Sequence, residues 1–170
     1  MISLPSVDYL RECFDLTTQG VLRWRERPQS HFRTCRGWKT FNAQFAGKTA
    51  GTPSTGGYLV ISINKRLYKV HRIVFALANN REPRLPIDHR NGTGDDNRPE
   101  NLREATATQN QLNKRGSGVL GVKNVYRRGK SFEVKLRKPG GQVHRVGCFQ
   151  TLRGAILARD EAIRRIHGEF

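Results

Sequence analysis

Three strings of residues decide the fold of this chain: Ile87-Asp88-His89-Arg90-Asn91-Gly92, Asn97-Arg98-Pro99-Glu100-Asn101-Leu102 and Gln109-Asn110-Gln111-Leu112-Asn113. The first two are polar apart from Ile87 and Leu102, and turn-forming residues fill the segment between them. This pattern predicts two short extended pieces, 87–90 and 101–104, joined by a loop. We expect a helix next, capped by Thr106 or Thr108 and running to about Lys114.

The polar side chains of these strings have the chemistry that phosphodiester hydrolysis requires. His89 suits the general base, because an imidazole titrates near neutral pH. The leaving oxygen and the phosphorane need positive charge beside them, which a hard divalent cation with oxygen ligands supplies. Asp88 and the amide oxygen of Asn110 are such ligands, and the amide of Asn101 suits the task of orienting the imidazole.

Upstream of these strings, the hydrophobic pattern predicts a hairpin followed by a helix. Leu59, Ile61 and Ile63 alternate with other residues, as in a half-buried strand, and residues 66–70 form the expected second strand. Apolar residues then recur at helical spacing over 71–78.

Residues 1–57 carry no recognisable chemistry. A short helix is expected over Val7–Phe14 and a strand over Gly20–Trp24, while residues 25–57 are mixed and end in the glycine-rich segment 51–57, which we expect to be an irregular loop. The preferred interpretation of this region is an extension that packs on the rest of the chain and contacts the DNA backbone.

The best predicted domain boundary is Gly116-Ser117-Gly118. Beyond it the pattern predicts three strands and a helix: a strand over 119–126, a basic turn over 127–130, a strand with Phe132, Val134 and Leu136 on one face, a strand over 143–149, and a helix capped by Thr151 and ended by Gly168.

The charge of the chain points to a polyanionic partner. The formal net charge is +17, and residues 116–170 hold 12 of the 31 Lys and Arg residues against 4 of the 14 acidic ones. Such a field attracts nucleic acid, which we prefer over an anionic membrane surface or an inert basic surface. The expected DNA contacts are Arg90, Arg98, Arg127, Arg128, Lys130, Lys135, Arg137 and Arg145.

The cysteines and the hydropathy limit the cellular setting. Cys13, Cys35 and Cys148 are odd in number and form no C-x-x-C pair, which argues against a disulfide framework and a cysteine zinc site. No apolar run is long enough to span a membrane, and residues 1–10 lack the features of a secretory signal. We therefore expect reduced thiols and a cytoplasmic location, with no membrane partner.

The central strings resemble the HNH homing endonucleases of phages and introns. Val70-His71-Arg72, the Asp88-His89 pair with the following Asn-rich string, and Gln109-Asn110 occur in the family's order, with 12 positions from His89 to Asn101 and 21 from His89 to Asn110. The resemblance implies a ββα-metal fold in which His89 is the general base, Asp88 and Asn110 bind one Mg²⁺ or Mn²⁺ ion, and Asn101 orients His89. It covers residues 58–115 well and 1–57 loosely.

Several assignments within that resemblance have competitors. Asn97 and Asn113 are close alternatives to Asn101 and Asn110, although a turn former and a solvated helix residue are their simpler roles. His71 is included among the catalytic candidates, but packing at a helix start or contact with a phosphate is its commoner role. Arg90 stands where an apolar residue is expected, and the cysteine pairs of zinc-braced members are absent, so no structural zinc is expected.

The C-terminal residues resemble the DNA-binding domain of ethylene-response factors, the AP-two domain. The resemblance rests on Gly121-Val122, the strand 132–137, Val146-Gly147-Cys148-Phe149, and Asp160-Glu161-Ala162 leading to His167-Gly168. It implies a three-stranded sheet laid in the major groove with a helix behind it. Arginine reads guanine edges and lysine mostly contacts phosphate. Arg159 departs from the apolar residue expected at its position.

Together these patterns predict an α+β protein with three parts: an N-terminal extension (1–57) packed on an HNH nuclease core (58–115), and an AP-two-like domain (116–170). The expected function is metal-dependent, site-preferring cleavage or nicking of double-stranded DNA by a monomer or weak dimer, in a phage or intron homing role inside a bacterial host cell. The alternatives are a DNA-binding regulator with an inactive nuclease domain and a nonspecific nuclease.

Overall fold

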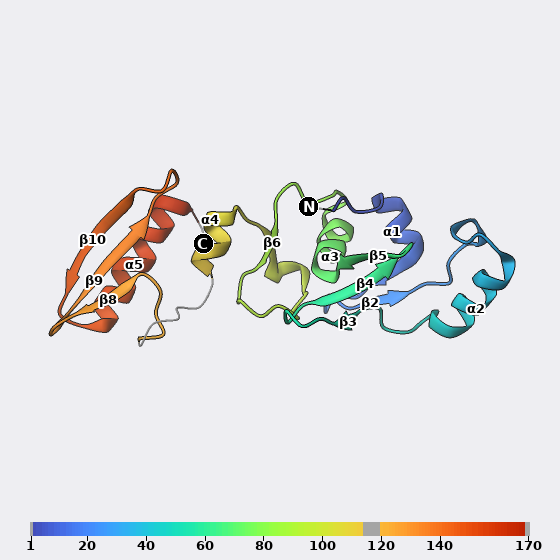
Figure 1. Ribbon diagram of the computed structural model, residues 1–170, viewed down its shortest axis with the longest axis horizontal. Coiled ribbons are helices and arrows are strands. Elements are labelled where there is room, and N and C mark those ends of the chain that lie inside the picture. The colour runs from blue at the N-terminus through green and yellow to red at the C-terminus, as the bar shows by residue number, and fades with distance from the viewer. Residues whose placement is uncertain (1, 114–119, 169–170) are drawn as a thin grey trace. The chain divides into compact units, whose positions relative to one another are not determined.

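Short helices and antiparallel strands alternate along the chain, as the α+β prediction requires (Figure 1). The computed structural model describes residues 2–113 and 120–168, and its contacts divide the chain into two units, Met1–Glu104 and Ala105–Phe170. The first unit contains α1 (Val7–Cys13), β1 (Phe14–Leu16), β2 (Leu22–Trp24), η1 (Gln29–His31), α2 (Cys35–Phe45), β3 (Thr52–Pro53), β4 (Leu59–Ile63), β5 (Arg66–Lys69), α3 (Val70–Asn79), β6 (Ile87–His89), η2 (Pro99–Asn101) and β7 (Leu102–Glu104). The second contains α4 (Ala107–Asn113), β8 (Val125–Arg128), β9 (Ser131–Arg137), β10 (Val143–Phe149) and α5 (Leu152–His167).

Residues before and after position 57 share one hydrophobic core in the first unit. Leu10 of α1 and Leu22 of β2 belong to the same buried cluster as Ile63 of β4 and Ile73 of α3. The apolar positions of α3 recur at helical spacing, and one face of the helix is therefore wholly covered. The N-terminal region is thus part of the fold that carries Asp88 and His89.

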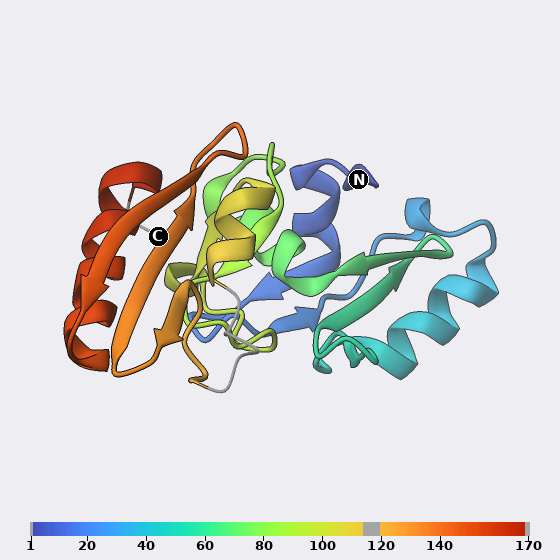
Figure 2. The same cartoon turned by 60° about the vertical axis from the view of Figure 1, so that its left-hand side comes forward.

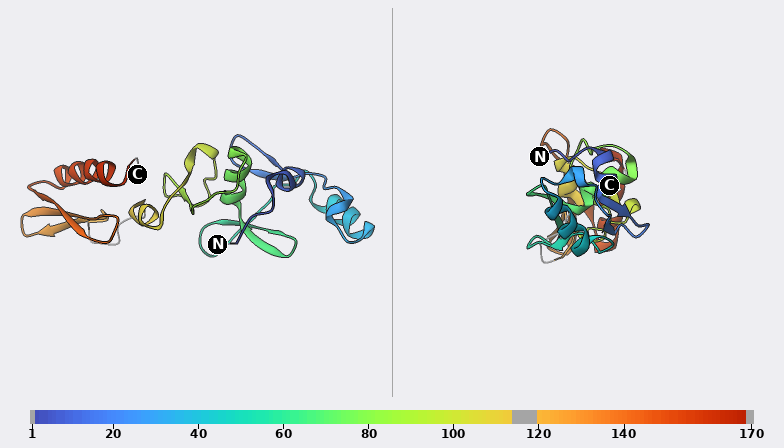
Figure 3. Two further views of the ribbon diagram at one scale, coloured as in Figure 1. Left: turned by 90° about the horizontal axis from the view of Figure 1, so that it is seen from above. Right: turned by 90° about the vertical axis from the view of Figure 1, so that its right-hand side faces the viewer.

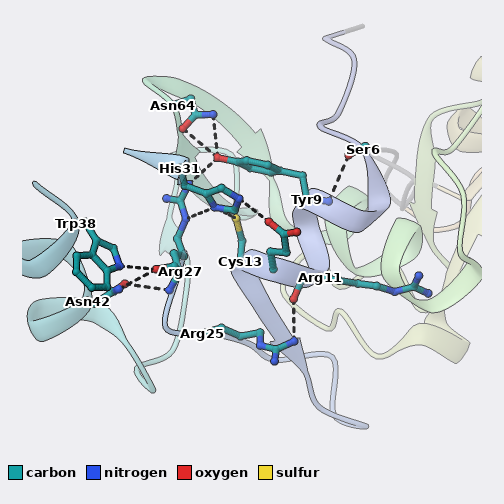
Figure 4. Close-up of polar contacts among 11 residues, drawn as sticks. Ser6, Tyr9, Arg11, Cys13, Arg25, Arg27, His31, Trp38, Asn42 and Asn64 are labelled. Carbon is teal, nitrogen blue, oxygen red and sulfur yellow. Dashed lines mark hydrogen bonds and ion pairs between the residues drawn. The ribbon is translucent and has the colours of Figure 1, made fainter. Parts of the chain in front are cut away.

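Helix α2, within the segment expected to be mixed, is held to the unit by Arg27 (Figure 4). The backbone carbonyl of Arg27 accepts hydrogen bonds from Trp38 Nε1 at 2.8 Å and Asn42 Nδ2 at 2.9 Å. Its guanidinium donates to Tyr9 Oη at 2.6 Å and to His31 Nδ1 at 3.2 Å. The ring of Phe32 lies 4.8 Å from the same guanidinium. A buried arginine is tolerated here because hydrogen bonds and aromatic faces surround it.

A three-stranded sheet, in the order β3-β4-β5, precedes helix α3. The predicted hairpin is present, and Asn64 and Lys65 turn the chain with φ of 49° and 64°. The prediction that the whole of segment 51–57 is irregular is wrong, because Thr52 and Pro53 pair with Val60 and Leu59. A proline is compatible with this edge position, since its missing N–H is not needed there.

Strands β6 and β7 form the predicted extended pair around the 90–101 loop. The register sets Ile87 opposite Glu104, Asp88 opposite Arg103, and His89 opposite Leu102. Ile87 and Leu102 are both buried and belong to the cluster under α3. Burial of Ile87 and Leu102 therefore fixes the strand pair and, with it, the positions of Asp88 and Arg103.

The second unit has a sheet in the order β10-β9-β8 with α5 along one face (Figures 2 and 3). Val134 and Leu136 of β9 pack with Ala155 and Ala162 of the helix in two small clusters. Helix α5 begins after Thr151, whose hydroxyl accepts from Gly154 N, and ends at Gly168, as predicted. Arg159 is half-buried and pairs with Asp160 at 2.6 Å, which accommodates its charge.

The first strand of this sheet differs from the prediction. Residues 120–124 precede β8, which begins at Val125 and includes Arg127 and Arg128, so the predicted turn 127–130 is reduced to Gly129 and Lys130. Val119 and Lys114, the predicted ends of a strand and of a helix, lie outside the described residues, as does the Gly116-Ser117-Gly118 boundary. Among the helices that the structure describes, none is long and apolar enough to cross a membrane.

Candidate active site

His89 is the buried polar centre of the first unit. It ends β6, and only 4% of its surface is exposed. Its Nε2 lies 3.1 Å from Asn97 Oδ1. Because an amide oxygen only accepts, Nε2 carries the proton that this contact uses. The contact gives the imidazole the fixed direction that a general base needs.

The two asparagines of the following loop have different tasks. Asn97 is buried and contacts His89, whereas the sequence assigned the orienting role to Asn101 and kept Asn97 as its competitor. The Asn101 side chain accepts from Asn91 N at 3.1 Å and donates to Asp96 O at 2.7 Å. Asn101 therefore closes the loop that carries Asn97, and its catalytic assignment stays a prediction.

Asp96 and Arg98 stiffen the same loop. Arg98 donates from Nε to Asp96 Oδ1 at 2.9 Å and from Nη2 to Asp96 Oδ2 at 2.8 Å. The guanidinium lowers the pKa of Asp96 to about 2, chiefly through these hydrogen bonds. Arg98, a predicted DNA contact, is thus an exposed residue that forms an ion pair with Asp96.

Asp88 is held by the residue opposite it in the strand pair. Arg103 donates from Nε to Asp88 Oδ2 at 3.0 Å, and its Nη2 lies 3.0 Å from the same oxygen. The two side chains are 13% and 11% exposed, so water screens the pair little. The guanidinium fixes the direction of the Asp88 carboxylate.

The donor set around Asp88 is compatible with a hard divalent cation. Mg²⁺ is commonly bound by one or two carboxylates together with substrate phosphates and waters. In residues 2–113 and 120–168 no group of three or more His, Cys, Asp and Glu side chains is placed to hold a metal ion. The Asp88 carboxylate is an oxygen ligand of the kind that such a cation takes.

His71 and Tyr58 pack against His89. The rings of His71 and His89 meet edge to face with centroids 5.0 Å apart, and the Tyr58 ring lies 5.2 Å from His71 and 5.9 Å from His89. Burial, with the charges of His89, Lys69 and Arg72, lowers the pKa of His71 to about 3. His71 is therefore neutral at physiological pH, which suits packing, and its catalytic assignment stays a prediction.

Tyr58 also packs against the loop that carries Asn97. A Cβ at Gly94 would lie 2.8 Å from Gly57 O and 3.2 Å from a Tyr58 ring carbon, so the loop approaches Tyr58 closely. Lys69 Nζ lies 4.3 Å from the ring centroid, as in a cation–π contact. Tyr58 thus links β4, α3 and the loop of Asn97.

Asn110, the second predicted metal ligand, lies on α4 in the other unit. It is half-buried, and its backbone N–H donates to Thr106 O at 2.9 Å, which starts the helix as predicted. Gln109 caps this start by accepting from Thr106 N. The structure thus brings together Asp88, His89 and His71, with Asn101 in the adjoining loop, and the place of Asn110 in the site stays a prediction.

The remaining predicted DNA contacts are basic surface residues. Arg90 in the first unit is exposed, as are Arg127, Arg128, Lys130, Arg137 and Arg145 in the second, while Lys135 is half-buried. Arg127 pairs with Phe132, on the helix side of the sheet. Arg128, Lys135 and Arg145 all contact Glu133.

Sequence reasoning missed two residues of the site, Tyr58 and Arg103. The contact of Arg103 with Asp88 could have been predicted, because a register that pairs Ile87 with Glu104 sets Asp88 opposite Arg103. Nothing in the sequence pattern distinguishes Tyr58 from any residue that begins a strand. Its role arises from packing between segments far apart in the chain.

Comparison with known proteins identifies the chemistry of this region. Residues 68–112 match the family model described as HNH endonuclease. The segment includes His71, Asp88, His89, Asn101 and Asn110, and confirms the prediction that the chain is a DNA-cleaving hydrolase with an HNH endonuclease domain. No curated protein and no solved structure matches the chain.

Proposed function

We propose that this DNA-cleaving hydrolase is a metal-dependent endonuclease that prefers particular sites in duplex DNA. The observation that carries the proposal is the buried His89, whose Nε2 donates to Asn97 and which follows Asp88 within the matched segment. A buried, oriented imidazole next to a carboxylate is what hydrolysis of a phosphodiester by an activated water requires.

In the proposed mechanism, the imidazole of His89 accepts the proton of the attacking water. Asn97 orients the ring, and Tyr58 and His71 hold its plane. Asp88 and Asn110 would hold a divalent cation, Mg²⁺ or Mn²⁺, which when bound supplies positive charge to the phosphorane and the leaving oxygen. Arg103 holds the Asp88 carboxylate in a fixed direction before DNA binds.

The second unit supplies the proposed site preference. Its sheet exposes basic residues on the face opposite α5, and arginine side chains on a rigid sheet suit contact with base edges in the major groove. This proposal rests on the resemblance to the AP-two domain. The homing role, the phage or intron origin, action within a bacterial cell, and nicking by a monomer or weak dimer rest on resemblance in the same way.

A DNA-binding regulator with an inactive nuclease domain is the second candidate. The ion pair of Asp88 with Arg103 favours it, because a cation must compete with the guanidinium for the carboxylate. The retention of Asp88, His89 and Asn110 in one chain weighs against it.

The test is cleavage of supercoiled plasmids that carry a library of inserts, with Mg²⁺, Mn²⁺ or EDTA. We compare the unmodified chain, His89→Ala, and His144→Ala, which removes a histidine from the second unit. The proposal expects discrete nicked or linear products with metal for the unmodified chain and His144→Ala. It expects none for His89→Ala, which should still retard DNA in a gel.

The other outcomes separate the alternatives. Equal cleavage by His89→Ala would remove His89 from the mechanism. An absence of cleavage with every cation, together with tight site-specific binding, would favour the regulator. Digestion of any plasmid to small fragments would support a nonspecific nuclease.

A further inference from the structure

Glu133 lies beneath a cluster of three cations, one from each strand of the second unit's sheet. Arg128 Nε of β8 lies 3.1 Å from Oε2, Lys135 Nζ of β9 lies 3.0 Å from the same oxygen, and Arg145 Nε of β10 lies 2.9 Å from Oε1. The Glu133 side chain is 6% exposed, whereas those of Arg128 and Arg145 are 65% and 64% exposed. The carboxylate is thus covered by the cations that it binds.

The register of the strands places this cluster on the face opposite α5. Glu133 pairs with Tyr126 on one side and Cys148 on the other, and Lys135 pairs with Arg145. The intervening residues Val134 and Leu136 point into the clusters that include α5. Glu133 and its cations therefore belong to the face proposed to contact DNA.

Glu133 holds Arg128 and Arg145 near the middle of their side chains, and Cys148 also holds the end of Arg145. Both contact Glu133 through Nε, which restrains the side chain near its middle. Among the described residues, no group accepts a hydrogen bond from the terminal nitrogens of Arg128, whereas Arg145 Nη2 donates to Cys148 Sγ at 3.2 Å. A guanidinium fixed in this way loses less conformational entropy when it pairs with a guanine edge.

Glu133 has two opposed effects on DNA binding. Lys135 and the two arginines lower the pKa of Glu133 and so favour its charged form. That negative charge subtracts from the positive field that attracts phosphates. The hydrogen bonds of Glu133, in contrast, hold three cations in one array, and fixed geometry is what discriminates between base sequences.

We propose that Glu133 is a positioning residue for sequence preference: it sets Arg128, Lys135 and Arg145 in a fixed array that contacts base edges of duplex DNA. This inference rests on the proposed function of the sheet as the DNA-contacting module. It predicts that loss of the carboxylate weakens discrimination without weakening attraction to DNA.

The experiment measures two affinities of the full chain in EDTA, which stops metal-dependent cleavage. One is for the duplex that the unmodified chain selects from a random library, and the other is for a pool of random duplexes, each at several salt concentrations. Glu133→Gln should bind random duplexes as tightly as the unmodified chain or more tightly, while the ratio of selected to random affinity falls by about tenfold, the loss of one well-formed base contact.

Two control variants make the result specific. Glu161→Gln removes the same charge from an exposed position on α5, and should raise affinity for random DNA slightly without changing the ratio. Glu133→Asp keeps the charge but shortens the reach, and should lower the ratio without changing the salt dependence. Thermal unfolding of each variant separates these effects from loss of the fold.

The outcomes distinguish this inference from the proposal beneath it. An unchanged ratio for Glu133→Gln and Glu133→Asp, with Arg145→Ala lowering the ratio, overturns the role of Glu133 and leaves the DNA-contacting sheet intact. If the triple variant Arg128→Ala, Lys135→Ala, Arg145→Ala binds both duplexes as the unmodified chain does, the sheet is not the DNA-contacting surface and both proposals fail.

Discussion

Replacing Gly20 with alanine tests how the N-terminal region supports the active site. Gly20 lies in the turn between β1 and β2 with φ of +74°. A Cβ at Gly20 would collide with Asn97 O and lie 2.5 Å from Arg98 N. These are backbone atoms and cannot rotate away, so either the turn or the loop of Asn97 must move. Because Asn97 holds His89, the substitution should disturb the general base from a distance.

The expected loss in the free energy of unfolding has two parts, and the same substitution at a second glycine separates them. A left-handed backbone costs an alanine about 1–2 kcal/mol, and overpacking in a filled site costs about 1–3 kcal/mol more. Gly47 has nearly the same φ, +77°, with no atom within 4 Å of its built Cβ. Gly47→Ala should therefore lose only the first part, about 1–2 kcal/mol, and Gly20→Ala about 2–5 kcal/mol.

Tryptophan fluorescence during urea unfolding is the assay. Both tryptophans of the chain, Trp24 and Trp38, lie in the first unit, so their emission reports on that unit alone. Plasmid nicking at low temperature, where both variants are folded, gives the second readout, and Gly20→Ala alone should be slow. Equal losses of stability and equal nicking rates for the two variants would refute the proposed contact between Gly20 and the loop of Asn97.

Two further predictions concern the rings that surround His89. Burial lowers the pKa of His71 in the folded state from 6.5 to about 3, so the stability gained by keeping this imidazole neutral is complete above pH 6.5 and falls as the pH drops below that value. The free energy of unfolding of the first unit, measured by urea titration, should therefore drop by about 2 kcal/mol between pH 7 and pH 5. An equal drop in His71→Gln would contradict the assignment. Tyr58→Leu, which removes the ring from His71 and His89, should slow cleavage about tenfold or more with DNA affinity unchanged, whereas Tyr58→Phe should retain the rate; equal rates for Leu and Phe in single-turnover cleavage would show that the ring does not position His89.

Elements with a strong local signal were predicted well. Helix α5 has a threonine cap, apolar residues at helical spacing and a terminal glycine, and it occupies the expected range. Helix α2 was missed, although Thr34 is a capping residue and Trp38, Phe41 and Phe45 lie at helical spacing. Its stability comes largely from Arg27 and the aromatic residues around it, which are contacts that a local pattern does not contain.

Strand ends were less predictable than strand cores. The strand 143–149 agrees with β10, although a bulge between Arg145 and Gly147 interrupts its alternation. The start of β8 was placed too early, and β3 was not expected, since pairing with β4 rather than residue preference makes Thr52–Pro53 a strand.

By itself, the sequence determined the chemistry of the site: Asp88 and His89 are adjacent in the chain, and the order and spacing of the later strings indicate an HNH endonuclease domain, as the match to residues 68–112 bears out. Only the tertiary structure decided that Asn97 rather than Asn101 contacts His89, that Arg103 holds Asp88, and that Glu133 gathers one cation from each strand. The physical reason is the range of the interactions. Residue type and spacing limit which reactions a segment can perform, whereas the choice between neighbouring side chains depends on loop closure and strand register, which the packing of distant segments determines.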